Sequence, residues 1–131
     1  MTEKQKNQLD YVDEAENVIK SIQVKKRNGD FMISLTTSKI RNILSMVSEI
    51  YNEVIHEQGE KLSEKSQSRI QYLRLRIVYE AGRDKDVRNF VDKAKLLIKI
   101  KSIGADKEKF LRFCNYMEAL VAYHRYYGGK E

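Results

Sequence analysis

The chain has 131 residues, with no proline, six glycines and one cysteine, and its 25 Lys or Arg against 19 Asp or Glu give a formal net charge of +6. A single cysteine excludes an internal disulfide, and no apolar run approaches the roughly 20 residues of a membrane-spanning helix. The opening residues lack the apolar segment of a secretory signal, so we expect a cytoplasmic protein with no membrane contact.

The positive charge is concentrated in one part of the chain. Residues 61–101 hold twelve Lys or Arg and five Asp or Glu, a local balance of +7, so the remainder sums to −1. A basic block of this kind predicts a polyanionic partner, with nucleic acid as the first candidate. The alternative is that surface lysines simply keep a small protein soluble.

The first predicted elements are a helix and an irregular connection. Apolar residues at spacings of 3 and 4 over residues 8–22 predict a helix with an acidic outer face. Residues 24–35 differ, because Asn28-Gly29 lies between short apolar runs, which is the signal of a hairpin turn. No other strand is predicted, so we expect an extended connection or a small isolated hairpin.

Two strong helices are predicted next. Thr36 or Thr37 should cap the first of them, which we expect to stop near Gly59. The other should begin near Ser63 and end just before Gly82, which can adopt the left-handed turn. The core stripe of the first is predicted to consist of Ile40, Ile43, Leu44, Val47, Ile50, Tyr51, Val54 and Ile55.

The last part of the chain predicts two further helices. Asp84 should cap one that runs to Gly104, and Asp106 one that ends near Gly128. The inner face of the former is predicted to be Val87, Phe90, Val91, Ala94, Leu97, Ile98 and Ile100 or Lys101. We therefore expect an all-α fold, a compact bundle of about five helices forming a single domain over residues 1–131.

One helix carries a regular pattern of arginine and tyrosine. Arg69, Arg76 and Arg83 are seven residues apart, and Tyr72 and Tyr79 follow the first two by three. On a helical wheel these five side chains, the arginine–tyrosine strip, occupy a sector roughly 80° wide. Arginine can donate two hydrogen bonds to a phosphate and tyrosine can stack on a base, so the strip predicts a nucleic-acid surface. The alternative is a half-buried edge of the core, with arginine stems covering apolar surface.

A second basic pair begins the preceding helix. Lys39 and Arg41 lie in its first turn, where free backbone N–H groups can help to hold a phosphate.

Catalytic signals are weak throughout the sequence. His56 and His124 are far apart, and His124 lies on an apolar row, as a core histidine does. Cys114 with His124 is a poor match to a nucleophile pair or a metal site. The arginine-x4-6-histidine spacing of some ribonucleases is absent, since Arg112 precedes His124 by twelve residues and Arg41 precedes His56 by fifteen. No phosphate-binding glycine loop or HExxH is present, so we expect no enzyme, no metal and no cofactor.

Three segments resemble a known family. They are YLRLRIVYEAGRDKDVRNFVDKAKLLIKIKSIG, the ending FLRFCNYMEALVAYHRYYGGKE and the helix start LTTSKIRNIL. From about Leu35 onward the chain resembles the small subunit of type III-A CRISPR (Csm) effector complexes. The resemblance implies a noncatalytic, all-helical subunit, several copies of which stack inside a ribonucleoprotein in antiviral defence. RNA cleavage would then belong to the backbone subunits, and DNase and cyclic-oligoadenylate synthesis to the large subunit.

The resemblance also implies partners and contact residues. The partners would be target RNA and the crRNA–target duplex, other copies of the chain, and the backbone and large subunits. A subunit that accepts any target should contact phosphates rather than bases, because the guide reads the sequence. Candidate contacts are Lys39, Arg41, Arg69, Arg76 and Arg83, with Arg74 and Arg88 as weaker ones. Arg74 points away from the strip by roughly 140°, which also suits contact with a protein neighbour.

Two other interpretations stay open. The stretch YEAGRDKDV joins two predicted helices in the manner of a helix-turn-helix, with the helix over residues 85–101 as the DNA reader. Against this, that helix presents mostly lysine outward. The remaining alternative is a purely structural helical subunit whose positive charge meets an acidic protein.

Overall fold

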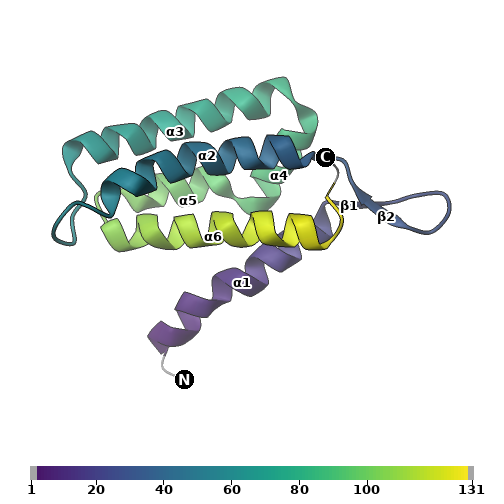
Figure 1. Ribbon diagram of the computed structural model, residues 1–131, viewed down its shortest axis with the longest axis horizontal. Helices are drawn as coiled ribbons and strands as arrows, with labels where there is room; N and C mark the ends of the chain where they lie inside the picture. Colours follow the sequence, from purple (N-terminus) through teal and green to yellow (C-terminus); the bar gives the residue numbers. More distant parts are fainter. Residues whose placement is uncertain (1–2, 130–131) are drawn as a thin grey trace.

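Six helices and one short hairpin make up the described chain, which confirms the all-α prediction. The structure is a computed structural model that describes the backbone of residues 3–129 and the side chains of residues 10–129 (Figure 1). The elements are α1 (Glu3–Ser21), β1 (Gln23–Lys25), β2 (Phe31–Ile33), α2 (Thr37–Val54), α3 (Glu64–Arg83), α4 (Lys85–Ala94), α5 (Leu96–Ile103) and α6 (Lys107–Tyr126).

Side-chain caps fix where α2, α3, α4 and α6 begin. Thr36, Ser63, Asp84 and Asp106 each accept a hydrogen bond from a backbone N–H in the first turn of the helix that follows. A cap of this kind typically contributes about 1 kcal/mol, because it satisfies a donor that the helix itself cannot pair. The predicted helix starts are therefore confirmed, with Thr36 rather than Thr37 as the cap of α2.

Of the two possibilities expected for residues 24–35, an extended connection or a small hairpin, the structure has the hairpin. β1 and β2 are antiparallel, with Gln23 paired to Ile33 and Lys25 to Phe31. Gly29 has φ 92°, the left-handed conformation that the turn requires and that glycine adopts without strain. The hairpin projects from one end of the bundle (Figure 1).

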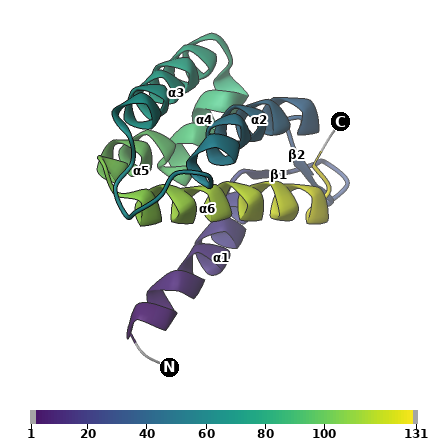
Figure 2. The same ribbon diagram turned by 60° about the vertical axis from the view of Figure 1, so that its left-hand side comes forward.

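α6 lies at the centre of the packing. It contacts α1, α2 and α5, while α3 packs on α2, α4 and α5. Figure 2 shows α1 crossing beside α6, with the N-terminal end of α1 pointing away from the other helices. The largest fully buried side chains come from all six helices and the segments between them: Phe90, Phe110, Ile19, Ile33, Ile40, Ile43, Leu62, Ile70, Ile77, Leu96, Ile100 and Met117.

His124 is a core histidine, as its position in the apolar row predicts. Its Nε2 lies 2.7 Å from the carbonyl oxygen of Leu35, and because a carbonyl only accepts, Nε2 carries the proton. The backbone of Gly129 covers the imidazole so closely that any Cβ at that position would collide with the ring. The bond ties the C-terminal end of α6 to the connection between the hairpin and α2.

The prediction of one helix over residues 85–103 is wrong. Lys95 is left-handed, with φ 56° and ψ 38°, and separates α4 from α5. The break interrupts the helical periodicity, so the residues of α5 do not continue the inward face of α4. Ile98, which was predicted to face inward, is 70% exposed. The break is held from outside: the Tyr116 hydroxyl donates to the Ala94 carbonyl at 3.0 Å. No glycine or proline marks this position, so the local sequence carries no signal for it.

We expect Lys95→Gly to stabilise the protein. A non-glycine residue in the left-handed region costs roughly 1–2 kcal/mol, and glycine removes that cost while adding some unfolded-state entropy. The free energy of unfolding should rise by up to about 1 kcal/mol in urea titrations. Lys93→Gly, two residues earlier and inside α4, should lower it by about 0.5 kcal/mol. Equal losses in both variants would contradict the assigned conformation of Lys95.

Two predicted helix ends are also corrected. α2 ends at Val54, before Gly59, and Ile55 is exposed rather than part of the core. The chain leaves the helix early because the Glu57 carboxylate turns toward the start of α3, where it accepts hydrogen bonds from Ser63 and Ser66. These bonds lower the pKa of Glu57, with the Ser66 hydroxyl as the largest cause.

The end of α3 is later than predicted. Gly82 is helical rather than left-handed, and α3 continues to Arg83. Asp84, with φ −144° and ψ 116°, ends α3 and caps α4, so no left-handed glycine is needed between the two helices.

Candidate nucleic-acid interface

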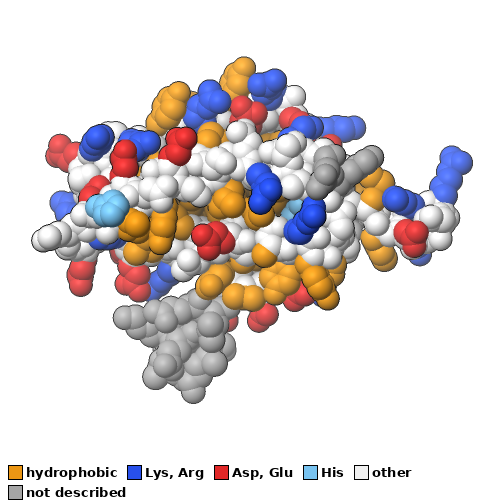
Figure 3. Space-filling view, in the orientation of Figure 1, with side chains coloured by type: hydrophobic (Ala, Val, Ile, Leu, Met, Phe, Trp, Pro, Cys, Tyr) orange, Lys and Arg blue, Asp and Glu red, His pale blue; other side chains and the backbone are white. Residues whose placement is uncertain are grey.

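The arginine–tyrosine strip lies on the outer face of α3. Tyr72 and Tyr79 are 62% and 59% exposed, whereas Ile70, Leu73 and Ile77 on the opposite side are buried. The alternative that the two tyrosines form a half-buried core edge therefore fails. Figure 3 shows Lys or Arg side chains interspersed with hydrophobic and acidic ones along the edge of the molecule that α3 forms.

The ring of Tyr79 contacts two arginines of the strip. The guanidinium carbons of Arg76 and Arg83 lie 5.8 and 5.7 Å from the centre of its ring. Contacts of this kind contribute about 0.5–1 kcal/mol at exposed sites. Arg76 also approaches Glu80 at 3.6 Å. Two guanidinium groups thus lie close to one exposed aromatic ring.

Arg69 differs from the other two strip arginines. It is half-buried and forms an ion pair with Glu53, which joins α3 to α2. It also borders a groove of about 350 Å³ between these helices, which is lined by Met46, Glu49, Ile50, Arg69, Tyr72, Leu73 and Arg76. Part of the Arg69 charge is therefore already balanced within the protein.

Lys39 is close to the end of the strip, but Arg41 is not. The Lys39 ammonium lies 2.5 Å from the Asp84 carboxylate, next in sequence to Arg83. The hydrogen bond raises the pKa of Lys39 and lowers that of Asp84. Arg41 instead lines a small cavity against α6 with His124. The predicted basic pair is therefore divided between two surfaces.

The two weaker candidates lie off the strip. Arg74 is half-buried and donates to the Gln71 side chain at 3.3 Å. Arg88 is exposed on α4 and lies 3.8 Å from Asp92. Neither side chain joins the row of Arg69, Arg76 and Arg83.

Sequence reasoning missed four basic residues with exposed side chains. Lys65 precedes Tyr72 by seven residues, as Tyr72 precedes Tyr79, so it extends the strip toward the start of α3. That spacing is visible in the sequence. Lys25, Lys26 and Arg27 form the end of the hairpin, and their signal is the basic run just before Asn28-Gly29.

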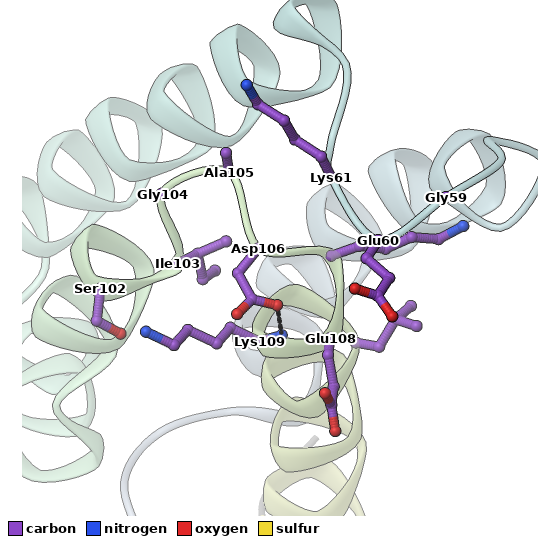
Figure 4. A pocket seen from close by; sticks show the side chains of 12 residues that line it. Gly59, Glu60, Lys61, Ser102, Ile103, Gly104, Ala105, Asp106, Glu108 and Lys109 are labelled. Carbon is purple, nitrogen blue, oxygen red and sulfur yellow. Dashed lines mark hydrogen bonds between the residues drawn. The ribbon is translucent and has the colours of Figure 1, made fainter.

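The hollow with the largest volume among those described lies away from the arginine–tyrosine strip. It lies where residues 59–61 meet residues 102–109 and is lined by charges of both signs (Figure 4). Asp106, which faces it, accepts a hydrogen bond from the backbone N–H of Lys109 and so caps α6. The carboxylate is therefore engaged in holding a helix start.

Cys114 and His124 do not form a reactive pair. Burial, with a smaller contribution from Glu118, raises the pKa of the Cys114 thiol to about 12, so the thiol stays protonated at neutral pH. His124 is held by the Leu35 carbonyl. Within residues 10–129, no group of three or more His, Cys, Asp or Glu is placed to hold a metal ion. Among the described helices, none is long and apolar enough to cross a bilayer.

Fold and surface define a small all-helical protein with a basic, tyrosine-bearing face. The family model described as Csm2 Type III-A matches residues 6–130. The protein named CRISPR system Cms protein Csm2 from Mycobacterium tuberculosis is 41% identical over 124 residues, covering 95% of this chain and 96% of that protein. Its namesake from Streptococcus thermophilus is 42% identical over 121 residues, covering 92% and 93%. The chain belongs to the Csm2 family, the small subunits of type III-A CRISPR complexes.

Proposed function

We propose that the chain is a noncatalytic subunit that holds target RNA along the crRNA–target duplex, through phosphate contacts that do not depend on sequence. It acts in the cytoplasm, as one domain, beside other copies of itself and the backbone and large subunits of the complex. This function deepens the family assignment by naming a surface and a ligand.

The observation that carries the proposal is the solvent-facing strip on α3. The guanidinium groups of Arg76 and Arg83 both lie close to the exposed ring of Tyr79. Arginines seven residues apart are separated by roughly 10 Å along a helix, so a strand lying along α3 meets one guanidinium after another. Such contacts position a strand without reading its bases. The guide RNA, through base pairing, would supply the specificity.

The candidate residues receive different roles in this proposal. Arg76 and Arg83 make the principal phosphate contacts, with Lys65 extending the row. Arg69 contributes less, because Glu53 shares its charge. Lys39 adds to the end of the row where Asp84 holds it.

Three candidates are assigned elsewhere. Arg41, Arg74 and Arg88 lie off the strip and are proposed as contacts to other parts of the complex.

The helix-turn-helix alternative is less well supported. Its reader helix over residues 85–101 is interrupted at Lys95, which leaves α4 with ten residues. The other alternative is a structural subunit whose partner is an acidic protein. A binding measurement distinguishes RNA binding, sequence-specific DNA binding and binding to an acidic protein.

The test is the affinity of the full chain for labelled nucleic acids, measured by fluorescence anisotropy at two salt concentrations. Two single-stranded RNAs of unrelated sequence should bind with similar Kd, and log Kd should rise with log salt by roughly 0.7 per phosphate contacted. Preference for one duplex DNA sequence would favour the helix-turn-helix alternative. Absence of binding to any nucleic acid would favour an acidic protein partner.

A further inference from the structure

The β1–β2 hairpin is an extension of the bundle whose outer part contributes nothing to the core. Its base is anchored, since Ile22, Ile33 and Leu35 are buried. Beyond that base the two strands pack chiefly on each other. An isolated two-stranded hairpin is marginally stable in water, so the outer residues are not explained by folding.

The tip of the hairpin concentrates positive charge. Lys25, Lys26 and Arg27 are consecutive and exposed, and none forms an ion pair with any residue from 10 to 129. The one acid of the tip, Asp30, is exposed and engaged with Asn28: its carboxylate accepts from the Asn28 amide at 3.1 Å, and its backbone N–H donates to the Asn28 side chain at 3.0 Å. Residues 25–30 therefore carry three positive charges and one negative charge, a balance of +2.

Apolar side chains accompany these charges. Phe31 is 59% exposed and Val24 52% exposed. Phe31 is paired with Lys25 across the hairpin, so an aromatic ring and a cation share the same position along the strands. Figure 3 shows Lys and Arg side chains at the outer end of the hairpin and hydrophobic ones where it approaches the bundle.

We propose that the hairpin tip is a second RNA contact, in which Phe31 stacks on an unpaired base while Lys25, Lys26 and Arg27 contact the flanking phosphates. Basic grooves with exposed aromatic side chains bind single strands in this way, because every base has a face on which a ring can stack. The inference rests on the proposed function only for the class of ligand.

The size of the tip favours a nucleotide over a protein partner. A specific protein interface buries at least about 1,000 Å² in total, whereas this tip is a three-pair hairpin. Stacking also requires a base that is free of its neighbours, which excludes a continuous duplex as the ligand. The hairpin is therefore assigned to a single-stranded segment.

The test uses the full chain and a single-stranded RNA that carries one 5-iodouridine, with cross-linking by ultraviolet light and mass spectrometry of the peptides. The wild type should cross-link at Phe31. Phe31→Leu keeps an apolar side chain but cannot stack, and should lower both the cross-link and single-strand affinity by about fivefold or more. Its affinity for duplex RNA should be unchanged. A Phe31→Leu variant that binds and cross-links like the wild type would overturn the proposal.

Charge is tested separately from stacking. Lys25→Ala/Lys26→Ala/Arg27→Ala should weaken single-strand binding more than Lys93→Ala/Lys101→Ala/Lys109→Ala, a control that removes three exposed lysines from α4, α5 and α6. Equal weakening in both would overturn the assignment of the tip. So would displacement of the RNA from Phe31 by polyglutamate as readily as by unlabelled RNA of equal charge.

The proposal for the hairpin and the proposal for the strip can be refuted independently of each other. If the strip variant Arg69→Ala/Arg76→Ala/Arg83→Ala binds normally while the hairpin variant does not, the hairpin stands and the proposed strip function falls. If only the strip variant loses affinity, the strip stands and the hairpin contact falls. Survival of the Phe31 cross-link in the strip variant, at protein concentrations raised to restore binding, supports two separate contacts.

Discussion

The variant Arg69→Ala/Arg76→Ala/Arg83→Ala is expected to bind single-stranded RNA about 100-fold more weakly than the wild type while remaining folded. The guanidinium–phosphate contacts of the strip are assigned about 1 kcal/mol on average, below the range for charged hydrogen bonds because these groups are solvated. Arg69 should lie below this average and Arg76 and Arg83 above it, because Glu53 shares the charge of Arg69. Three contacts then give about 3 kcal/mol, or roughly 100-fold in Kd. The slope of log Kd against log salt should fall by about 2, since three phosphate contacts are lost.

A matched variant distinguishes the strip from overall charge. Lys93→Ala/Lys101→Ala/Lys109→Ala also removes three positive charges, but from exposed positions that lie neither on α3 nor on the hairpin. It should weaken binding far less than the strip variant. Comparable losses would show that net charge alone attracts the RNA.

Thermal melts check the fold of the strip variant. Among residues 10–129, Arg69 forms the one strip ion pair that joins two helices, and a pair this accessible to solvent contributes at most about 1 kcal/mol. The variant also loses the two cation–π contacts to Tyr79, which contribute about 0.5–1 kcal/mol each, so stability should fall by no more than about 3 kcal/mol in all. If the variant showed no cooperative unfolding transition, the arginines would be needed to hold the bundle together, contrary to their assignment as a binding surface.

His124→Leu is expected to lower the free energy of unfolding by about 1–3 kcal/mol, because it leaves the buried carbonyl of Leu35 without a donor. His124→Gln retains an N–H donor on a side chain of similar reach, so it should recover part of this loss. His56→Leu alters an exposed histidine and should change stability by less than about 0.5 kcal/mol.

Urea titration with hydrogen exchange measures this effect. Because His124 holds the connection between the hairpin and α2, amides near Leu35 should lose protection first in His124→Leu. Equal stability of His124→Leu and His56→Leu would contradict the structural role of the buried bond.

Much of the fold could be predicted because its signals are local. Ser63, Asp84 and Asp106 precede apolar periodic segments, and each caps the helix that follows. Asn28-Gly29 also marked the hairpin locally, although the loop spans residues 26–30 and of these two residues Gly29 alone is left-handed. The spacing of the strip also located an exposed face correctly.

What could not be predicted depends on residues distant in sequence. The break at Lys95 is supported by Tyr116, on another helix. The division of the basic pair follows from Lys39 meeting Asp84, 45 positions later, while Arg41 faces α6. Periodicity shows which side of a helix is apolar, but not which neighbour covers or neutralises the rest.

The burial of Cys114 has a practical consequence for chemical labelling. It is the only cysteine of the chain, and a protonated, enclosed thiol reacts slowly with maleimides. A cysteine introduced at an exposed position, such as Ser68→Cys on α3, would therefore take up a dye or spin probe selectively without removal of the natural one. Distances between neighbouring copies, or between α3 and a labelled RNA end, can then be measured in assembled particles with an otherwise unaltered protein.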